Sequence, residues 1–146
     1  MNELPYIDTQ TVTVRVPAAV VFETIERLVP RIAWGRFASA YARLVGAADL
    51  GVDRGPVGFQ VVHSAAPSVL VLRGEHRFSV YELAFRIEGY EQSVLSADTN
   101  AAFPGPLGRA YRTAVIGSGA HRIVVWRLLS EIKRRAEDTP TDRADR

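Results

Sequence analysis

The sequence predicts an α+β domain in which a curved antiparallel sheet wraps around a long C-terminal helix, with two short helices after the first strand. The chain opens with one strand-like segment and two helical ones, four strand-like segments then follow through short turns, and one long helical segment comes last. Strands joined by short turns pair antiparallel. A sheet with one apolar face needs a cover, and the last helix is the longest element available.

The opening of the chain is predicted to be a strand followed by two helices. Apolar and polar residues alternate over residues 9–16, as in a strand buried on one face. Pro17 suits the first position of a helix, where its missing N–H costs no hydrogen bond. Apolar residues at spacings of four and three predict the first helix over residues 18–28, which Pro30 is expected to end. A second helix is predicted over residues 36–48.

Four strands are predicted next, over residues 57–64, 68–75, 78–88 and 92–103. In the last two, alternate side chains form an apolar inward face. That face consists of Tyr81, Leu83, Phe85 and Ile87 in the third strand, and of Leu95, Ala97, Thr99, Ala101 and Phe103 in the fourth.

The C-terminal part is predicted to be a helix over residues 107–137, with Pro106 at its beginning. Gly117-Ser118-Gly119 lies in its middle, and each glycine costs about 1 kcal/mol relative to alanine in a helix. We expect a bend there, or a close approach to the backbone, and a more stable helix when both glycines are replaced by alanine. The domain is predicted to cover residues 1–137, and residues 138–146 are expected to be a disordered polar tail.

Composition argues against several classes of protein. A chain of 146 residues has the size of one domain, and no apolar run is long enough to cross a membrane. The sequence has no cysteine and its N-terminus lacks the features of a signal peptide, so a cytoplasmic protein is expected. The net charge is +2 and the basic residues are spread along the chain, which argues against nucleic-acid binding. No cofactor is indicated, and a monomer or homodimer is expected.

Candidate ligand-binding residues follow from the faces expected to point between sheet and helix. On the last helix, Gly117, His121 and Val125 share one face, and the glycine leaves room beside the imidazole. His121 either bonds to a ligand or exchanges a proton with it, or it is a structural residue held by a hydrogen bond. The predicted strands contribute Phe59, Val61, His63, Tyr81, Leu83, Phe85 and Thr99. His63 lies at the end of its strand, where an exposed side chain is an equal alternative. Trp34 is expected either to line the mouth of the cavity or to anchor the packing of the helices.

No catalytic motif and no metal site are predicted. The three histidines, at positions 63, 76 and 121, lack the close spacing of a zinc site. Glu82, Glu88 and Asp98 alternate outward on their strands, so a mechanism based on paired carboxylates has little support.

Residues 11–23 (TVTVRVPAAVVFE) form the predicted strand, proline and helix, and this opening resembles that of the START-like superfamily (SRPBCC), which includes polyketide cyclases, lipid-transfer START domains and the birch-pollen allergen group. The meander that leads into a C-terminal helix extends the resemblance over residues 9–135. Residues 103–112 look like the signature of a subfamily with no established activity. The resemblance implies a helix-grip fold with a deep cavity for lipids, sterols, polyketides or plant hormones.

Three functions are compatible with these observations. The first is binding or carrying a small hydrophobic molecule, such as a lipid or polyketide, in an apolar cavity with few polar groups. The alternative is an enzyme similar to polyketide cyclases and dehydratases, with His121 or His63 as general acid/base and Tyr81 or Thr99 orienting a carbonyl group. A third is an interaction module, which would expose an apolar patch. Fold alone cannot choose among them.

Overall fold

The computed structural model describes residues 3–34, 60–76 and 79–140, so the predicted helix over residues 36–48 lies outside the described residues. The described elements are, in chain order, β1 (Tyr6–Val14), α1 (Ala18–Trp34), β2 (Gln60–Ala65), β3 (Val69–His76), β4 (Ser79–Glu88), β5 (Ser93–Ala102), α3 (Gly105–Val115) and α4 (Ala120–Asp138).

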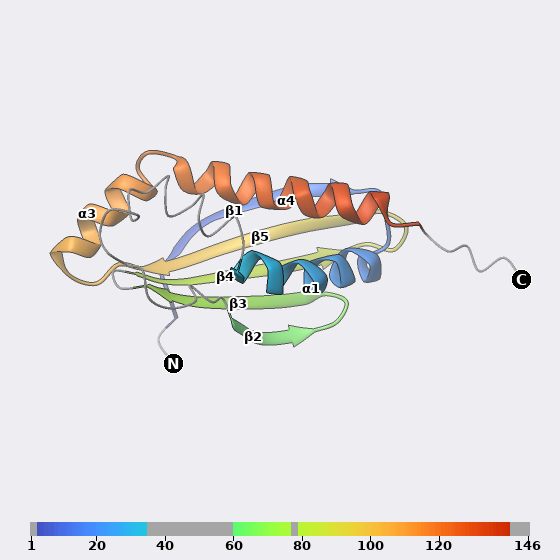
Figure 1. Ribbon diagram of the computed structural model, residues 1–146, viewed down its shortest axis with the longest axis horizontal. Coiled ribbons are helices and arrows are strands. Elements are labelled where there is room, and N and C mark those ends of the chain that lie inside the picture. The colour runs from blue at the N-terminus through green and yellow to red at the C-terminus, as the bar shows by residue number, and fades with distance from the viewer. Residues whose placement is uncertain (1–2, 35–59, 77–78, 141–146) are drawn as a thin grey trace, which may run out of the picture.

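The strands form one antiparallel sheet in the order β1-β5-β4-β3-β2. Because β2 to β5 are neighbours in chain order, the predicted meander is confirmed, and β1 completes the sheet by pairing with β5. The sheet is curved, and α1 and α4 lie side by side across its concave face (Figure 1). The predicted α+β helix-grip architecture is therefore confirmed.

The core lies between the concave face and these two helices. Alternate residues of β1, β4 and β5 meet a buried stripe on each helix, as the period of two in strands and 3.6 in helices requires. The large apolar side chains of the core that are most completely buried are Val14, Val21, Ile25, Leu70, Phe85, Leu95, Leu129 and Ile132. Burial of each such side chain stabilises the fold by about 1.5–3 kcal/mol.

Helix α1 continues past Pro30 to Trp34, so the predicted end of this helix is wrong. A proline inside a helix removes one hydrogen bond, the one to the carbonyl group four residues earlier, here that of Glu26. Glu26 is exposed, so water can bond to this carbonyl group. Ile25 and Leu28 are buried against the sheet, and this packing holds the helix despite the proline.

The predicted single C-terminal helix is in fact two, because α3 ends at Val115 and α4 begins at Ala120. The expected bend at the glycines is a complete turn. Gly119 has a φ of 75°, in the left-handed region that favours glycine. At Gly117 an added Cβ would lie 2.5 Å from the carbonyl oxygen of Thr113. The turn therefore requires both glycines, and the expectation that alanine would stabilise this segment is also wrong.

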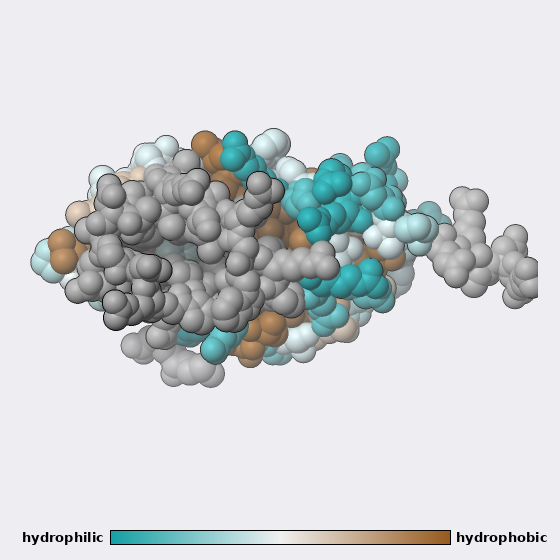
Figure 2. Space-filling view, viewed as in Figure 1, coloured by the Kyte–Doolittle hydropathy of each residue, from teal (hydrophilic) through white to brown (hydrophobic). Residues whose placement is uncertain are grey.

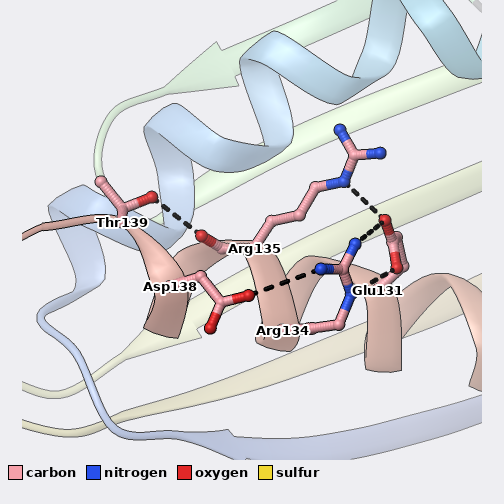
Figure 3. A network of polar contacts seen from close by, with 5 residues as sticks. All are labelled: Glu131, Arg134, Arg135, Asp138 and Thr139. Atoms are coloured by element: carbon pink, nitrogen blue, oxygen red, sulfur yellow. Dashed lines mark hydrogen bonds and ion pairs between the residues drawn. The ribbon is translucent and has the colours of Figure 1, made fainter.

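A network of charged side chains surrounds the C-terminal end of α4 (Figure 3). The Glu131 carboxylate accepts hydrogen bonds from Nη2 of Arg134 at 2.7 Å and from Nε of Arg135 at 2.5 Å. These two bonds lower the pKa of Glu131 from its usual 4.5 to about 2. Oγ1 of Thr139 donates to the carbonyl oxygen of Arg135 at 2.8 Å. The helix accordingly includes Asp138, which was expected to begin the tail.

Gly119→Ala is expected to destabilise the protein by about 1–2 kcal/mol, because an L-residue is strained at a positive φ. Gly119→Asn should cost less, since asparagine tolerates the left-handed conformation better. Urea unfolding of both variants measures the difference. Equal stability of Gly119→Ala and the parent protein would contradict the described turn.

Glu131→Gln is expected to flatten the acid dependence of stability. Because the folded-state pKa lies below the unfolded one, this carboxylate's contribution is complete above pH 4.5 and is lost as the pH falls towards about 2. The free energy of unfolding, measured in urea at steps across this window, should therefore change less with pH in the variant. Arg134→Gln combined with Arg135→Gln should likewise reduce the change of unfolding free energy with pH in this window. If that change persists in the double variant, the two arginines are not the cause of the lowered pKa of Glu131.

Candidate functional site

A group of polar side chains lies within the otherwise apolar interior where the sheet meets the first turn of α4. Asp8 comes from β1, Thr99 from β5, Tyr81 from β4 and His121 from α4. Thr99, Tyr81 and His121 are buried, and the Asp8 side chain is about a fifth exposed, at 22%. Four segments far apart in sequence thus bring one carboxylate, one imidazole and two hydroxyl groups together.

Strand register places Asp8 and Thr99 next to each other. Asp8 of β1 lies opposite Thr99 of β5, and Thr99 also lies opposite Leu83 of β4. Residues opposite each other in an antiparallel pair point to the same side of the sheet. That side is the concave one, because Leu83 and Ala97 on it are part of the core.

Two contacts join the first turn of α4 to β1. Nε2 of His121 lies 3.2 Å from Oδ1 of Asp8, and Nε2 of Gln10 donates to the carbonyl oxygen of Arg122 at 3.0 Å. The imidazole is nearly closed off from solvent, with 4% of the residue exposed. The pair of contacts fixes where α4 begins and holds His121 over the sheet.

An aromatic wall borders this polar group. The ring of Tyr81 lies 6.4 Å from the imidazole of His121, centre to centre, at an angle of 30°. Phe103 meets Tyr81 edge to face, with ring centres 5.8 Å apart and planes at 86°. Such edge-to-face packing fixes the orientation of both rings.

Two buried oxygen atoms of the group have no hydrogen-bond partner. Among the residues that the structure describes, nothing bonds to Oδ2 of Asp8 or to Oγ1 of Thr99. Leaving such an atom buried and unpaired costs about 1–3 kcal/mol. Two such atoms on neighbouring residues of one sheet face are a place where a further polar group could bond, since the described residues do not supply one.

The residues predicted as ligand-binding fall into three groups in the structure. Tyr81, Leu83, Phe85, Thr99, His121 and Val125 are buried between the sheet and the helices. Val61, His63 and Gly117 are exposed. Phe59 and the side chain of Trp34 lie outside the described residues.

The inward orientation expected for Val61 is wrong for a local reason, and of the two orientations left open for His63 the structure has the exposed one. The register of β2 against β3 shifts between these two residues, so simple alternation does not hold across them. β2 is also one of the two edge strands of the described sheet and is exposed along its whole length. Gly117 is exposed because the turn before α4 takes it off the face that carries His121 and Val125.

Sequence reasoning missed Asp8, since the first strand was predicted to begin at residue 9 and begins at Tyr6. The signal was present: Asp8 and Gln10 continue the alternation of Val12 and Val14 towards the N-terminus. Asp98 points outward as predicted, and it is nevertheless buried, because Arg86 and Oγ1 of Thr9 bond to its carboxylate.

A groove of about 310 Å³ lies elsewhere, between α1 and the end of α4. Its lining residues are Thr24, Arg27, Leu28, Arg135 and Thr139. Its polar side chains already have partners within the chain: Thr24 donates to a helix carbonyl group, Arg27 pairs with Glu23, and Arg135 pairs with Glu131. We therefore place the candidate site at Asp8 and Thr99, where polar atoms remain unpaired.

Within the described parts of the chain, no set of three histidine, cysteine or acidic side chains is grouped to hold a metal ion. Nor does any helix there combine the length and the apolar character needed to cross a bilayer.

Solved structures that are similar to this chain include polyketide cyclase-like and START proteins. A polyketide cyclase-like protein from Corynebacterium glutamicum is 14% identical over 90% of this chain and 86% of that one, with a TM-score of 0.42. The Zhui aromatase/cyclase from Streptomyces sp. R1128 is 14% identical over 89% and 92%, with a TM-score of 0.40. A START superfamily protein from Mycobacterium smegmatis is 14% identical over 89% and 98%, with a TM-score of 0.37.

No model of a protein family matches the chain, and no curated protein matches it significantly. At these identities and TM-scores the likeness concerns the fold and carries no argument about function.

Thr99→Val is expected to stabilise the ligand-free protein by about 1 kcal/mol, because valine fills the same volume without a buried unpaired hydroxyl group. Thr24→Val is the matched control. Its hydroxyl is also buried but donates to the carbonyl oxygen of Val20 at 2.7 Å, so its loss should cost about 1 kcal/mol. Urea unfolding compares the two. Destabilisation by both substitutions would show that the Thr99 hydroxyl has a partner.

Proposed function

We propose that the protein binds a small, mostly apolar molecule carrying a hydroxyl group, between the concave face of the sheet and the first turn of α4. The observation that supports this proposal is the pair of unpartnered, buried oxygen atoms on Asp8 and Thr99. They lie opposite each other in register on a face that is otherwise apolar. Apolar walls with a few well-placed polar groups are typical of small-molecule sites.

The chemistry of the two oxygen atoms defines the polar group of the ligand. A carboxylate such as that of Asp8 only accepts hydrogen bonds, whereas the hydroxyl of Thr99 both donates and accepts. A ligand hydroxyl can donate to Oδ2 of Asp8 and accept from Oγ1 of Thr99, and so satisfy both atoms. A carboxylate ligand would instead place a second negative charge beside Asp8. We therefore expect alcohols or phenols to bind, and acids to be rejected.

In this proposal His121 positions the carboxylate, because its Nε2 contacts Oδ1 and so leaves Oδ2 for the ligand. The proposal thus differs from the sequence-based hypothesis that the imidazole is itself the main polar contact. Tyr81 and Phe103 would form the apolar wall against which the ligand ring or chain packs.

A second candidate function is catalysis, and the contact between His121 and Asp8 favours it. An imidazole oriented by a carboxylate is an arrangement used in general acid/base catalysis. In such an enzyme, His121→Gln would lower turnover by about 10²–10⁴-fold. In a binding protein the same substitution would change affinity alone.

Three related probes test the proposed binding: naphthol, naphthalene and naphthoic acid, each measured by fluorescence titration and by native mass spectrometry of the protein. Naphthol is expected to bind about tenfold more tightly than naphthalene, since it adds hydrogen bonds to a charged group. Naphthoic acid should bind most weakly. Thr99→Val should remove most of the preference for naphthol and leave the affinity for naphthalene unchanged.

Thr24→Val serves as the control here too, and it should retain the full preference for naphthol. Equal affinity for all three probes, or no binding of any, would contradict the proposal. So would an unchanged preference in Thr99→Val, which would indicate that a bound water rather than a ligand bridges the two oxygen atoms.

A further inference from the structure

The outward face of the first half of α4 carries apolar side chains that the fold does not cover. Ile123 is 52% exposed and Trp126 is 62% exposed. They are three residues apart, so they are neighbours on the helix surface. His121, Val125 and Leu128 are buried on the opposite side. A solvated helix face normally carries polar residues, so this exposed pair is unusual.

Two arginines flank this apolar pair. Arg122 lies four residues before Trp126, and Arg127 lies four residues after Ile123, so both are adjacent to the pair on the helix surface. Both arginines are exposed. We call these four residues, Arg122, Ile123, Trp126 and Arg127, the α4 outer face. Figure 2 shows hydrophobic and hydrophilic residues side by side over the N-terminal part of α4, along the upper edge of the molecule.

The charged residues of the chain segment that carries this face are all of one sign. Between Asp98 and Glu131 the chain contains four arginines and no acidic residue, although the net charge of the whole chain is only +2. These four arginines, Arg109, Arg112, Arg122 and Arg127, form no ion pair with any residue in the described parts of the chain.

The second half of α4 is different, because Arg134 and Arg135 there are both paired with Glu131. The neighbouring helix α3 resembles the first half of α4: Leu107 is 68% exposed, and Arg109 and Arg112 are exposed as well. α3 precedes the turn that leads into the exposed part of α4 (Figure 1).

We propose that the α4 outer face docks on the surface of a bilayer that contains anionic phospholipids. Tryptophan prefers the interface between water and lipid, where its ring is partly buried and its N–H can still be bonded. The exposed arginines on either side, which pair with no acidic side chain among the described residues, are attracted to anionic headgroups. A second copy of the chain is a poorer occupant, because it would bring two sets of unpaired arginines together. This inference goes beyond the proposed ligand binding and does not depend on it.

Co-sedimentation with vesicles tests the proposal. We expect the protein to sediment with vesicles of equal parts phosphatidylglycerol and phosphatidylcholine, and to stay in solution with phosphatidylcholine alone. Arg122→Gln combined with Arg127→Gln should lower binding about 25-fold, since each arginine near an anionic surface contributes about fivefold. Ile123→Ala combined with Trp126→Ala should also weaken binding. A blue shift of tryptophan emission on binding should vanish in Trp126→Phe, which leaves Trp34 as the remaining tryptophan.

The control is Arg27→Gln combined with Arg134→Gln, which makes the same change in charge on exposed residues away from the α4 outer face. It should retain most of the vesicle binding. The proposal is overturned if the parent protein does not sediment with anionic vesicles, or if the control loses binding as fully as the test variant. It is also overturned if the parent elutes as a dimer that Trp126→Ala dissociates while vesicles bind neither protein. Binding of the naphthol probe should be unchanged in all these variants, so the two proposals fail separately.

Discussion

Strand β1 and Arg15, the residue that follows it, hold helix α4 at four points along its length, and the position of α4 determines both what is buried and what is exposed. Asp8 and Gln10 contact the first turn of the helix through His121 and the carbonyl group of Arg122. Towards the other end, Nζ of Lys133 donates to the carbonyl oxygen of Thr13 at 2.8 Å, and Glu137 bonds to Arg15. Between these contacts the helix is held by apolar burial, with Leu129 and Ile132 fully enclosed.

Polar contacts of this kind add little stability each, about 0.5–1.5 kcal/mol, compared with the apolar burial between them. Their main effect is to fix the position of α4 relative to β1. A helix held by apolar packing alone can slide or rotate at small cost, whereas hydrogen bonds at both ends select one position. The hydrogen bonds from the backbone and side chain of Arg15 also lower the pKa of Glu137. Because α4 is fixed in this way, His121 meets Asp8 and Oδ2 of Asp8 is left unpaired.

Local sequence patterns predicted where strands and helices lie better than they predicted where helices end or are interrupted. Alternation identified β4 and β5 and placed Tyr81 and Thr99 on the concave face, because strand periodicity depends only on neighbouring residues. The partner of His121 could not be found in this way, because Asp8 is 113 positions distant and meets it only through the tertiary fold. The two glycines correctly indicated an interruption just before α4. Helix propensity gives the free-energy cost of a glycine in a helix but not the backbone conformation that the glycine adopts. The sequence therefore predicted a bend where the structure has a turn. Burial of Ile25 and Leu28 likewise outweighed the local effect of Pro30.

The first turn of α4 belongs both to the proposed ligand site and to the α4 outer face, since His121 faces the interior and the adjacent residues Arg122 and Ile123 face solvent. A group bound on one side of this turn therefore acts on a backbone segment that also supports the other side. If docking shifts this turn at all, affinity for the interior ligand must change, and linkage requires the ligand to change docking by the same factor. The turn at residues 116–119 separates α4 from α3, so the position of the first turn of α4 is set by its contacts with β1 and not by a continuous helix. The contacts of Asp8 and Gln10 with this turn therefore support both proposed sites, because they hold His121 over the sheet and set the orientation of the residues that follow it.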